Sequence, residues 1–107
     1  MELKDLKILL ENAIGSGKVA YRSFPVGKAP KLPFICYLVD GSDNFLADSK
    51  VYKKITVVDV ELYTEIKDID TETALEDAFD QASIIWEKSE EYIDDEQVFE
   101  IVYTIRI

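Results

Sequence analysis

The chain contains no histidine, a single cysteine, and only three prolines and four glycines among its 107 residues. The lack of histidine excludes every histidine-based catalytic triad and the usual zinc sites. The lone Cys36 has no partner for an internal disulfide, which fits a reducing compartment.

Long apolar runs are also missing. No stretch of 18 apolar residues occurs, and the N-terminal residues do not form the apolar segment of a signal peptide, so neither membrane spanning nor secretion is expected. Apolar residues still make up 48% of the chain, a normal share for a folded protein. The length suits one domain that covers residues 1–107.

Basic residues are scarce, with 12 Lys and Arg against 22 Asp and Glu, which gives a formal net charge of −10. Such a charge argues against nucleic acid or an anionic membrane as the main partner. The balance is uneven, because residues 15–54 carry seven basic residues against three aspartates, whereas residues 55–107 carry three against sixteen. This asymmetry would suit copies of one chain that dock head to tail, basic part against acidic part.

The stretch 51–64 (VYKKITVVDVELYT) is dense in β-branched and aromatic residues, which predicts a strand. As one straight strand it would span roughly 46 Å at about 3.3 Å per residue. A compact domain of this length is only about 30–35 Å across. We therefore expect either a bend at a bulge or a lysine-rich start that projects as the arm of a hairpin. The even-numbered residues from 56 to 62 form the cleaner core face, and the odd-numbered residues mix carboxylates with apolar groups.

Residues 2–14 and 71–88 show apolar residues at helical spacing, and each segment has one apolar stripe. Gly15 is placed to end the first helix. Ile8 and Ile84 lie off these stripes among charged residues. We expect both isoleucines at protein interfaces, whose cores favour apolar groups over charge.

Three further segments complete the expected sheet. Residues 34–39 (FICYLV) form a continuous apolar run that predicts a strand covered on both faces. Residues 98–107 alternate cleanly and predict a half-buried strand antiparallel to 51–64. A short strand near 19–24 completes the set. Segments rich in turn-forming or charged residues are expected as loops at 15–33, 40–50, 65–70 and 90–96. The order α-β-β-α-β, with that extra short strand, predicts an α+β fold: a mainly antiparallel sheet with two helices on one face.

No motif predicts a catalytic, cofactor or metal site. Cys36 lies in an apolar run with no basic neighbour to lower its pKa, which favours a buried structural thiol. Residues 15–18 (GSGK) lack the first glycine and the final Ser/Thr of a phosphate loop and favour a helix end. Residues 40–44 (DGSDN) lack the glutamate that closes a calcium loop and favour a turn. The carboxylates at 94–96 (DDE) favour a solvated acidic turn.

Several clusters of residues resemble the small tail-terminator, or tail-completion (minor tail), proteins of long-tailed bacteriophages and prophages of Gram-positive bacteria. These clusters are Leu32-Pro33-Phe34 with Tyr37, Asn44-Phe45-Leu46-Ala47-Asp48 with Tyr52, Glu61-Leu62-Tyr63-Thr64 with Lys67-Asp68, and the segment from Trp86 through Tyr92-Ile93-Asp94-Asp95-Glu96 to Tyr103. Together they cover about residues 32–103.

The resemblance implies a non-enzymatic assembly protein of the virion, made in the bacterial host cytoplasm and acting without a cofactor. Such proteins form a ring, usually a hexamer, that caps the tail tube, ends its polymerisation and offers a surface to the head–tail connector protein. The implied partners are therefore copies of the chain itself, the tail-tube protein and the connector protein. The resemblance also implies an α+β fold.

Interface residues are expected from the charge asymmetry and from exposed-looking apolar groups. They are Phe45, Leu46, Lys50, Lys53, Lys54, Ile8 and Ile84. The lysines would meet an acidic surface of a neighbouring copy, and the segment 41–50 would contact the tube or the connector. Three alternatives stay open: a head–tail connector or adaptor protein, an acidic inhibitor that mimics nucleic acid, and a small enzyme that uses carboxylates.

Overall fold

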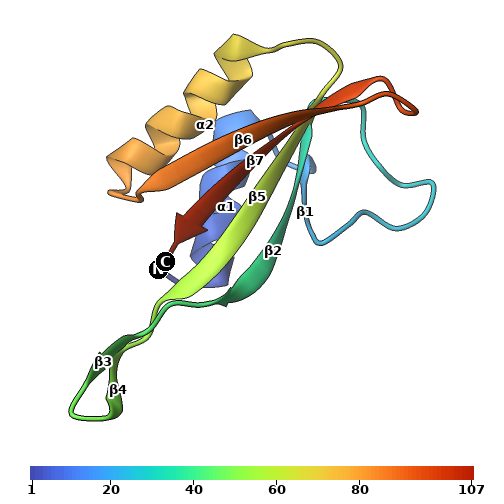
Figure 1. Cartoon of the computed structure of the whole chain (residues 1–107). Coiled ribbons are helices and arrows are strands. Elements are labelled where there is room, and N and C mark those ends of the chain that lie inside the picture. The colour runs from blue at the N-terminus through green and yellow to red at the C-terminus, as the bar shows by residue number, and fades with distance from the viewer.

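The computed structural model describes all residues from 1 to 107 and shows a twisted sheet with two helices on one face (Figure 1). The elements are α1 (Leu3–Ile14), β1 (Val19–Tyr21), β2 (Phe34–Ser42), β3 (Phe45–Ala47), β4 (Lys50–Lys53), β5 (Thr56–Thr64), α2 (Ile69–Gln81), β6 (Trp86–Ile93) and β7 (Val98–Arg106). The main sheet has the order β1-β2-β5-β7-β6, and β3 and β4 form a separate two-stranded sheet. Only the β1–β2 pair of the main sheet is parallel. The expected α+β fold class is confirmed.

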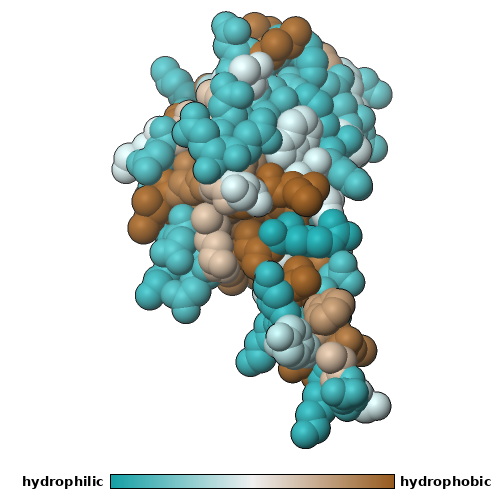
Figure 2. Space-filling model, turned by 90° about the vertical axis from the view of Figure 1, so that its left-hand side faces the viewer, coloured by the Kyte–Doolittle hydropathy of each residue, from teal (hydrophilic) through white to brown (hydrophobic).

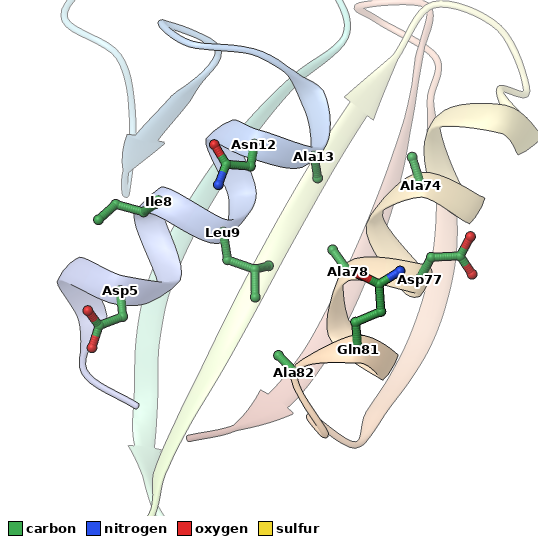
Figure 3. A pocket seen from close by; sticks show the side chains of 10 residues that line it. All are labelled: Asp5, Ile8, Leu9, Asn12, Ala13, Ala74, Asp77, Ala78, Gln81 and Ala82. Atoms are coloured by element: carbon green, nitrogen blue, oxygen red, sulfur yellow. The ribbon is translucent and has the colours of Figure 1, made fainter.

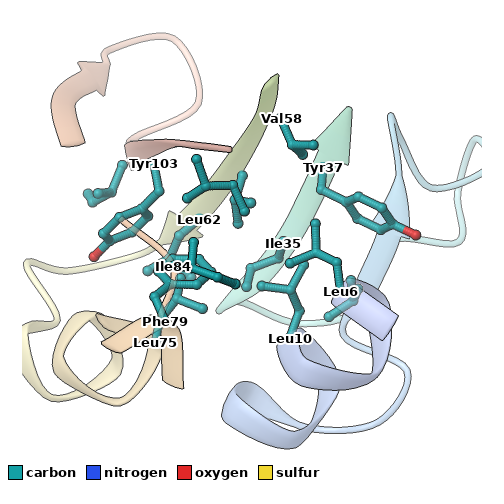
Figure 4. Packing of buried hydrophobic residues seen from close by; sticks show 14 residues of the cluster. Leu6, Leu10, Ile35, Tyr37, Val58, Leu62, Leu75, Phe79, Ile84 and Tyr103 are labelled. Carbon is teal, nitrogen blue, oxygen red and sulfur yellow. The ribbon is translucent and has the colours of Figure 1, made fainter. Parts of the chain in front are cut away.

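One hydrophobic core lies between the main sheet and the two helices (Figure 4). Its buried members are Leu6, Leu10, Val19, Ile35, Tyr37, Val58, Val60, Leu62, Leu75, Phe79, Ile84, Ile101, Tyr103 and Ile105. The three core residues that come from β5 are the even-numbered Val58, Val60 and Leu62, so the predicted core face of that strand is confirmed. The expected short strand near 19–24 is present as β1.

Local chemistry sets the helix ends. Gly15 ends α1 as expected, with a φ of 122° that favours glycine, and its N–H donates to the Glu11 carbonyl at 2.8 Å. Asp68 caps α2, because its carboxylate accepts from the Thr71 N–H at 3.1 Å and from the Thr71 hydroxyl at 2.6 Å.

The helix predicted over 71–88 is wrong in its second half. α2 ends at Gln81, Ser83 adopts a φ of 58°, and residues 86–93 form strand β6 instead. The reason is tertiary, since β6 pairs with β7 over eight residues, from Trp86 opposite Ile105 to Ile93 opposite Val98. The acidic turn predicted at 90–96 is correspondingly shorter, since Glu90 to Ile93 belong to this strand.

The stretch 51–64 is not one strand. Lys54 and Ile55 separate β4 from β5, and β4 folds back on β3 to form a hairpin beyond the main sheet (Figure 1). Of the two expected solutions, the projecting hairpin arm is therefore the one adopted. The segment 40–50, expected as a loop, contains the end of β2, all of β3 and the start of β4. The molecule measures 49 Å along its longest axis and 28 and 24 Å along the others.

Candidate interaction surfaces

The most distinctive surface is the projecting hairpin, residues 43–55, called the arm here. Asp48 and Ser49 form its two-residue turn with φ values of 52° and 62°, the left-handed conformation at both positions that type I′ hairpins need. A bulge leaves Tyr52 unpaired in the ladder. At the base of the arm the Asp43 N–H donates to the Ile55 carbonyl at 2.9 Å, and the Ile55 N–H donates to Asn44 Oδ1 at 2.9 Å.

The arm carries apolar and basic side chains that have little protein around them. Four large apolar residues are at least half exposed: Phe45 (57%), Leu46 (63%), Val51 (50%) and Tyr52 (76%). The rings of Phe45 and Tyr52 contact each other edge to face, 5.9 Å apart, at the base of the hairpin. Lys50, Lys53 and Lys54 are exposed beside them. Figure 2 shows the arm standing away from the body, with hydrophobic and hydrophilic residues mixed along it.

A second surface is an open hollow between the two helices, called the helix groove here, with a volume of about 590 Å³ (Figure 3). It is lined by Asp5, Ile8, Leu9, Asn12 and Ala13 of α1 and by Ala74, Asp77, Ala78, Gln81 and Ala82 around α2. Six of these ten residues are apolar, and none is basic. Ile8 is 58% exposed there.

The third surface is the face of the main sheet away from the helices, called the open face here. Strand alternation and register bring carboxylates from three adjacent strands to it: Asp59, Glu61, Glu87, Glu91 and Glu100. The Tyr63 hydroxyl donates to Glu100 at 2.7 Å, and it lies 3.3 Å from Glu61. Burial and the charges of Glu100 and Asp59 raise the pKa of Glu61, although the Tyr63 hydrogen bond opposes the shift.

On the helix side of the sheet, the buried carboxylate of Glu72 forms ion pairs with two lysines. Glu72 of α2 is only 2% exposed and accepts from the Lys67 ammonium at 2.6 Å and from the Lys88 ammonium at 3.1 Å. Lys88 also pairs with Glu76 at 2.7 Å, and the Tyr103 hydroxyl donates to the same carboxylate at 2.7 Å. These hydrogen bonds to carboxylates raise the pKa of both lysines. The network ties α2 to β6 and β7.

A hollow of about 520 Å³ lies where the segment 22–33 folds over one end of the open face. Cys36 lies at its floor and is buried, so desolvation, assisted by the charge of Glu61, raises its pKa. The thiol is therefore a poor nucleophile at neutral pH.

No group of three or more carboxylate or thiol side chains is arranged to hold a metal ion. Neither helix has the length and apolar character needed to cross a membrane.

The structure places the expected interface residues in three groups. Phe45, Leu46, Lys50, Lys53 and Lys54 all lie on the arm and are exposed.

Ile8 lies on the helix groove and is also exposed. Ile84 is only 7% exposed and belongs to the core, so its assignment to an interface is wrong. Because the chain reverses after Gln81, Ile84 is not on a helix face, and its N–H donates to the Phe79 carbonyl at 2.9 Å.

Three contributors to these surfaces were missed. Val51 and Tyr52 lie on the arm but were not among the expected interface residues, and Leu9 packs against the core and also lines the groove. The two consecutive lysines after Tyr52 are the signal for the arm, since they interrupt the apolar alternation.

The chain matches no protein-family model, no curated protein and no solved structure at a significant level.

Proposed function

We propose that this protein is a non-enzymatic assembly protein whose copies join through their surfaces, and that the assembly is a tail-terminator ring. The observation that carries the proposal is the arm, with its four exposed apolar side chains and three lysines. Exposed apolar side chains gathered on a projecting element mark protein–protein contact sites.

The arm has no visible role in the chain's own core, because no buried residue lies between Tyr37 and Val58. A contact between the arm and a different surface of a neighbour is heterologous, and contacts of that kind generate rings or open filaments. The positive arm and the net charge of −13 over residues 55–107 are complementary, which favours this arrangement over contact between two arms.

The specific role rests on the resemblance of residues 32–103 to tail-terminator proteins. In that role the ring, a hexamer in the usual case, caps the tail tube, ends its polymerisation and receives the head–tail connector protein. The partners are then other copies of the chain, the tail-tube protein and the connector protein, and the place of action is the virion. The arm and the open face supply surfaces for these contacts without a reaction centre.

The test is the oligomeric state of the full chain, alone and with the tail-tube protein of the same phage or prophage. We expect closed rings by negative-stain electron microscopy and a matching mass by sedimentation velocity. A chain that stays monomeric at millimolar concentration, with tail-tube protein present, overturns the proposal. Particles that lack the protein should have tails of uncontrolled length, and normal tails would count equally against it.

A second candidate is an acidic inhibitor that mimics nucleic acid, and the five carboxylates of the open face favour it. Residues two apart on a strand are roughly 6.6 Å apart, so Asp59 and Glu61 present charges at regular intervals. Inhibition of a nuclease, lost in the Asp59→Asn/Glu61→Gln variant, would support this candidate.

A head–tail adaptor belongs to the same assembly class as the first proposal, and pull-downs with isolated tail ends and isolated connectors would separate the two.

A further inference from the structure

We infer that the arm of one copy occupies the helix groove of a neighbouring copy. This inference rests on the proposed function and deepens it by naming the two surfaces that meet. It joins two features far apart in the fold, the β3–β4 hairpin and the cleft between α1 and α2 (Figures 1 and 3).

The helix groove has the character that an apolar hairpin needs. Its apolar lining consists of Ile8, Leu9 and Ala13 on one side and of Ala74, Ala78 and Ala82 on the other. The small side chains of the α2 alanines leave room between the helices, and Figure 3 shows Leu9 and Ala13 on the side of α1 that faces α2. The hollow of about 590 Å³ is within the range of sites that enclose ligand groups of moderate size.

The arm carries apolar side chains that could pack into this groove. The edge-to-face pair of Phe45 and Tyr52 forms a compact aromatic unit near the base, and Leu46 and Val51 pair further along the hairpin. Aromatic and aliphatic anchors that fill a partner's groove are the usual centre of a binding site. The turn and ladder also preorganise part of the short hairpin, which lowers the entropy lost on docking.

The charges of the two surfaces also favour docking of the arm into the helix groove. The groove carries Asp5 and Asp77 at its sides and no lysine or arginine. At 100° per residue, Lys7 of α1 points away from the groove, whereas Lys4 lies one turn before Ile8 on the same side of the helix, at the edge of the groove. The arm brings exposed lysines to the apolar side chains it carries. The arm, with three lysines against Asp43 and Asp48 and a net charge of +1, therefore meets an apolar groove lined by two aspartates.

The arm does not fill the groove of its own chain. It leaves the sheet where β2 ends and β5 begins and points away from the helices (Figure 1). The four apolar arm residues also keep the exposure given above, so the chain itself does not cover them. The occupant of the groove is therefore an arm from a second copy, and repetition of this heterologous contact closes a ring or extends a filament.

The open face is the competing acceptor, because it is also acidic. It carries five carboxylates and hydrogen-bonded polar groups along its centre, whereas most groove residues are apolar. Only the groove matches both properties of the arm, its charge and its apolar surface.

The experiment measures self-association of the full chain by sedimentation velocity, with Ala74→Arg as the variant that blocks the groove. Ala74 is exposed, so the fold tolerates the change, and the arginine both fills the groove and repels the arm lysines. We expect association at least tenfold weaker. Thr73→Arg adds the same charge at an exposed neighbouring position outside the groove and should change association less than threefold.

A charge exchange gives the positive test. Lys50→Glu/Lys53→Glu should abolish association of that variant, and so should Asp5→Lys/Asp77→Lys. An equal mixture of the two variants should recover mixed oligomers, because the reversed arm then meets the reversed groove. Circular dichroism of each variant confirms that its fold is intact.

The outcomes separate the two proposals. If Ala74→Arg associates like the native chain while replacement of residues 45–54 by Gly-Ser-Gly abolishes association, the arm docks elsewhere. The groove inference is then wrong and the assembly proposal stands. In that case Glu61→Lys/Glu100→Lys should weaken association, which would identify the open face. If the native chain never associates, alone or with tail-tube protein, both proposals fail.

Discussion

Replacement of residues 45–54 by Gly-Ser-Gly should leave the free energy of unfolding of the monomer nearly unchanged, because the arm contributes nothing to the core. All buried residues lie outside 38–57. The replacement keeps Asp43, Asn44 and Ile55, whose hydrogen bonds close the base of the arm. It also keeps the ion pair between Asp43 and Arg106 at 3.0 Å.

The magnitude follows from what the arm gains and loses on folding. The Phe45–Tyr52 contact is worth about 0.5–1.5 kcal/mol. Ordering ten residues costs on the order of 1–2 kcal/mol each, which the ladder and side-chain contacts of a two-stranded hairpin only just offset. Shortening the loop changes its closure entropy by about 1 kcal/mol at most. We therefore expect a stability within about 1 kcal/mol of the native chain.

The assay is urea unfolding at low protein concentration, followed by Trp86 fluorescence and by far-ultraviolet circular dichroism. Dilution matters because association would stabilise the native chain through mass action. Phe79→Ala is the matched control for a core change and should cost about 3–5 kcal/mol, since Phe79 is fully buried. A loss above about 2 kcal/mol in the arm variant, or loss of a single cooperative transition, would refute the reasoning and make the arm part of the fold.

Three smaller predictions concern the body of the protein. Tyr103→Phe removes the hydroxyl that donates to Glu76 at 2.7 Å and should lower the free energy of unfolding by about 1.5 kcal/mol in urea titrations; no change would contradict the hydrogen bond. Glu61→Gln should be more stable than the native chain at pH 7. Burial and neighbouring carboxylates raise the pKa of Glu61 in the folded state, so native stability falls as pH rises from its ordinary value of 4.5 through the folded pKa. The advantage of the variant should therefore disappear below about pH 4 in thermal melts, and a gain that persists there would have another cause. Ile84→Ala should cost about 2–4 kcal/mol, whereas Ile85→Ala, at a position 82% exposed, should stay within about 0.5 kcal/mol in the same urea assay; equal effects would contradict the burial of Ile84.

Several features of the fold could be predicted because their signal is local. The helical spacing of Leu6 and Leu10 and the stop at Gly15 determine α1. The two-residue alternation in β5 and β7 identifies which side chains face the helices. The same alternation assigns Asp59 and Glu61 to the opposite face, which the register with β7 confirms.

The second half of the helix predicted over 71–88 shows where local signals fail. Ala82, Ile85 and Trp86 continue an apolar helical stripe in the sequence, yet Trp86 begins β6. A strand there gives β7 a partner on its second side and satisfies backbone groups that would otherwise be unpaired. That gain depends on a strand that comes later in the chain, so no window around Trp86 contains it.

The candidate interaction surfaces also include one that the sequence indicated and one that it did not. The lysines at 50, 53 and 54 and the apolar pair Phe45 and Leu46 were identifiable from composition, and the excess length of 51–64 already indicated an arm. The helix groove was not identifiable, because it exists only where α1 and α2 lie side by side on the sheet.

By itself, the sequence determined which residues alternate, where the first helix ends, and how charge is divided along the chain, because these depend on neighbours a few residues apart. Only the tertiary structure decided that Ile84 is buried, that residues 86–93 pair with β7, and that an acidic apolar groove lies between the helices. Those outcomes depend on contacts between separate elements, which form only once the sheet and the helices pack together.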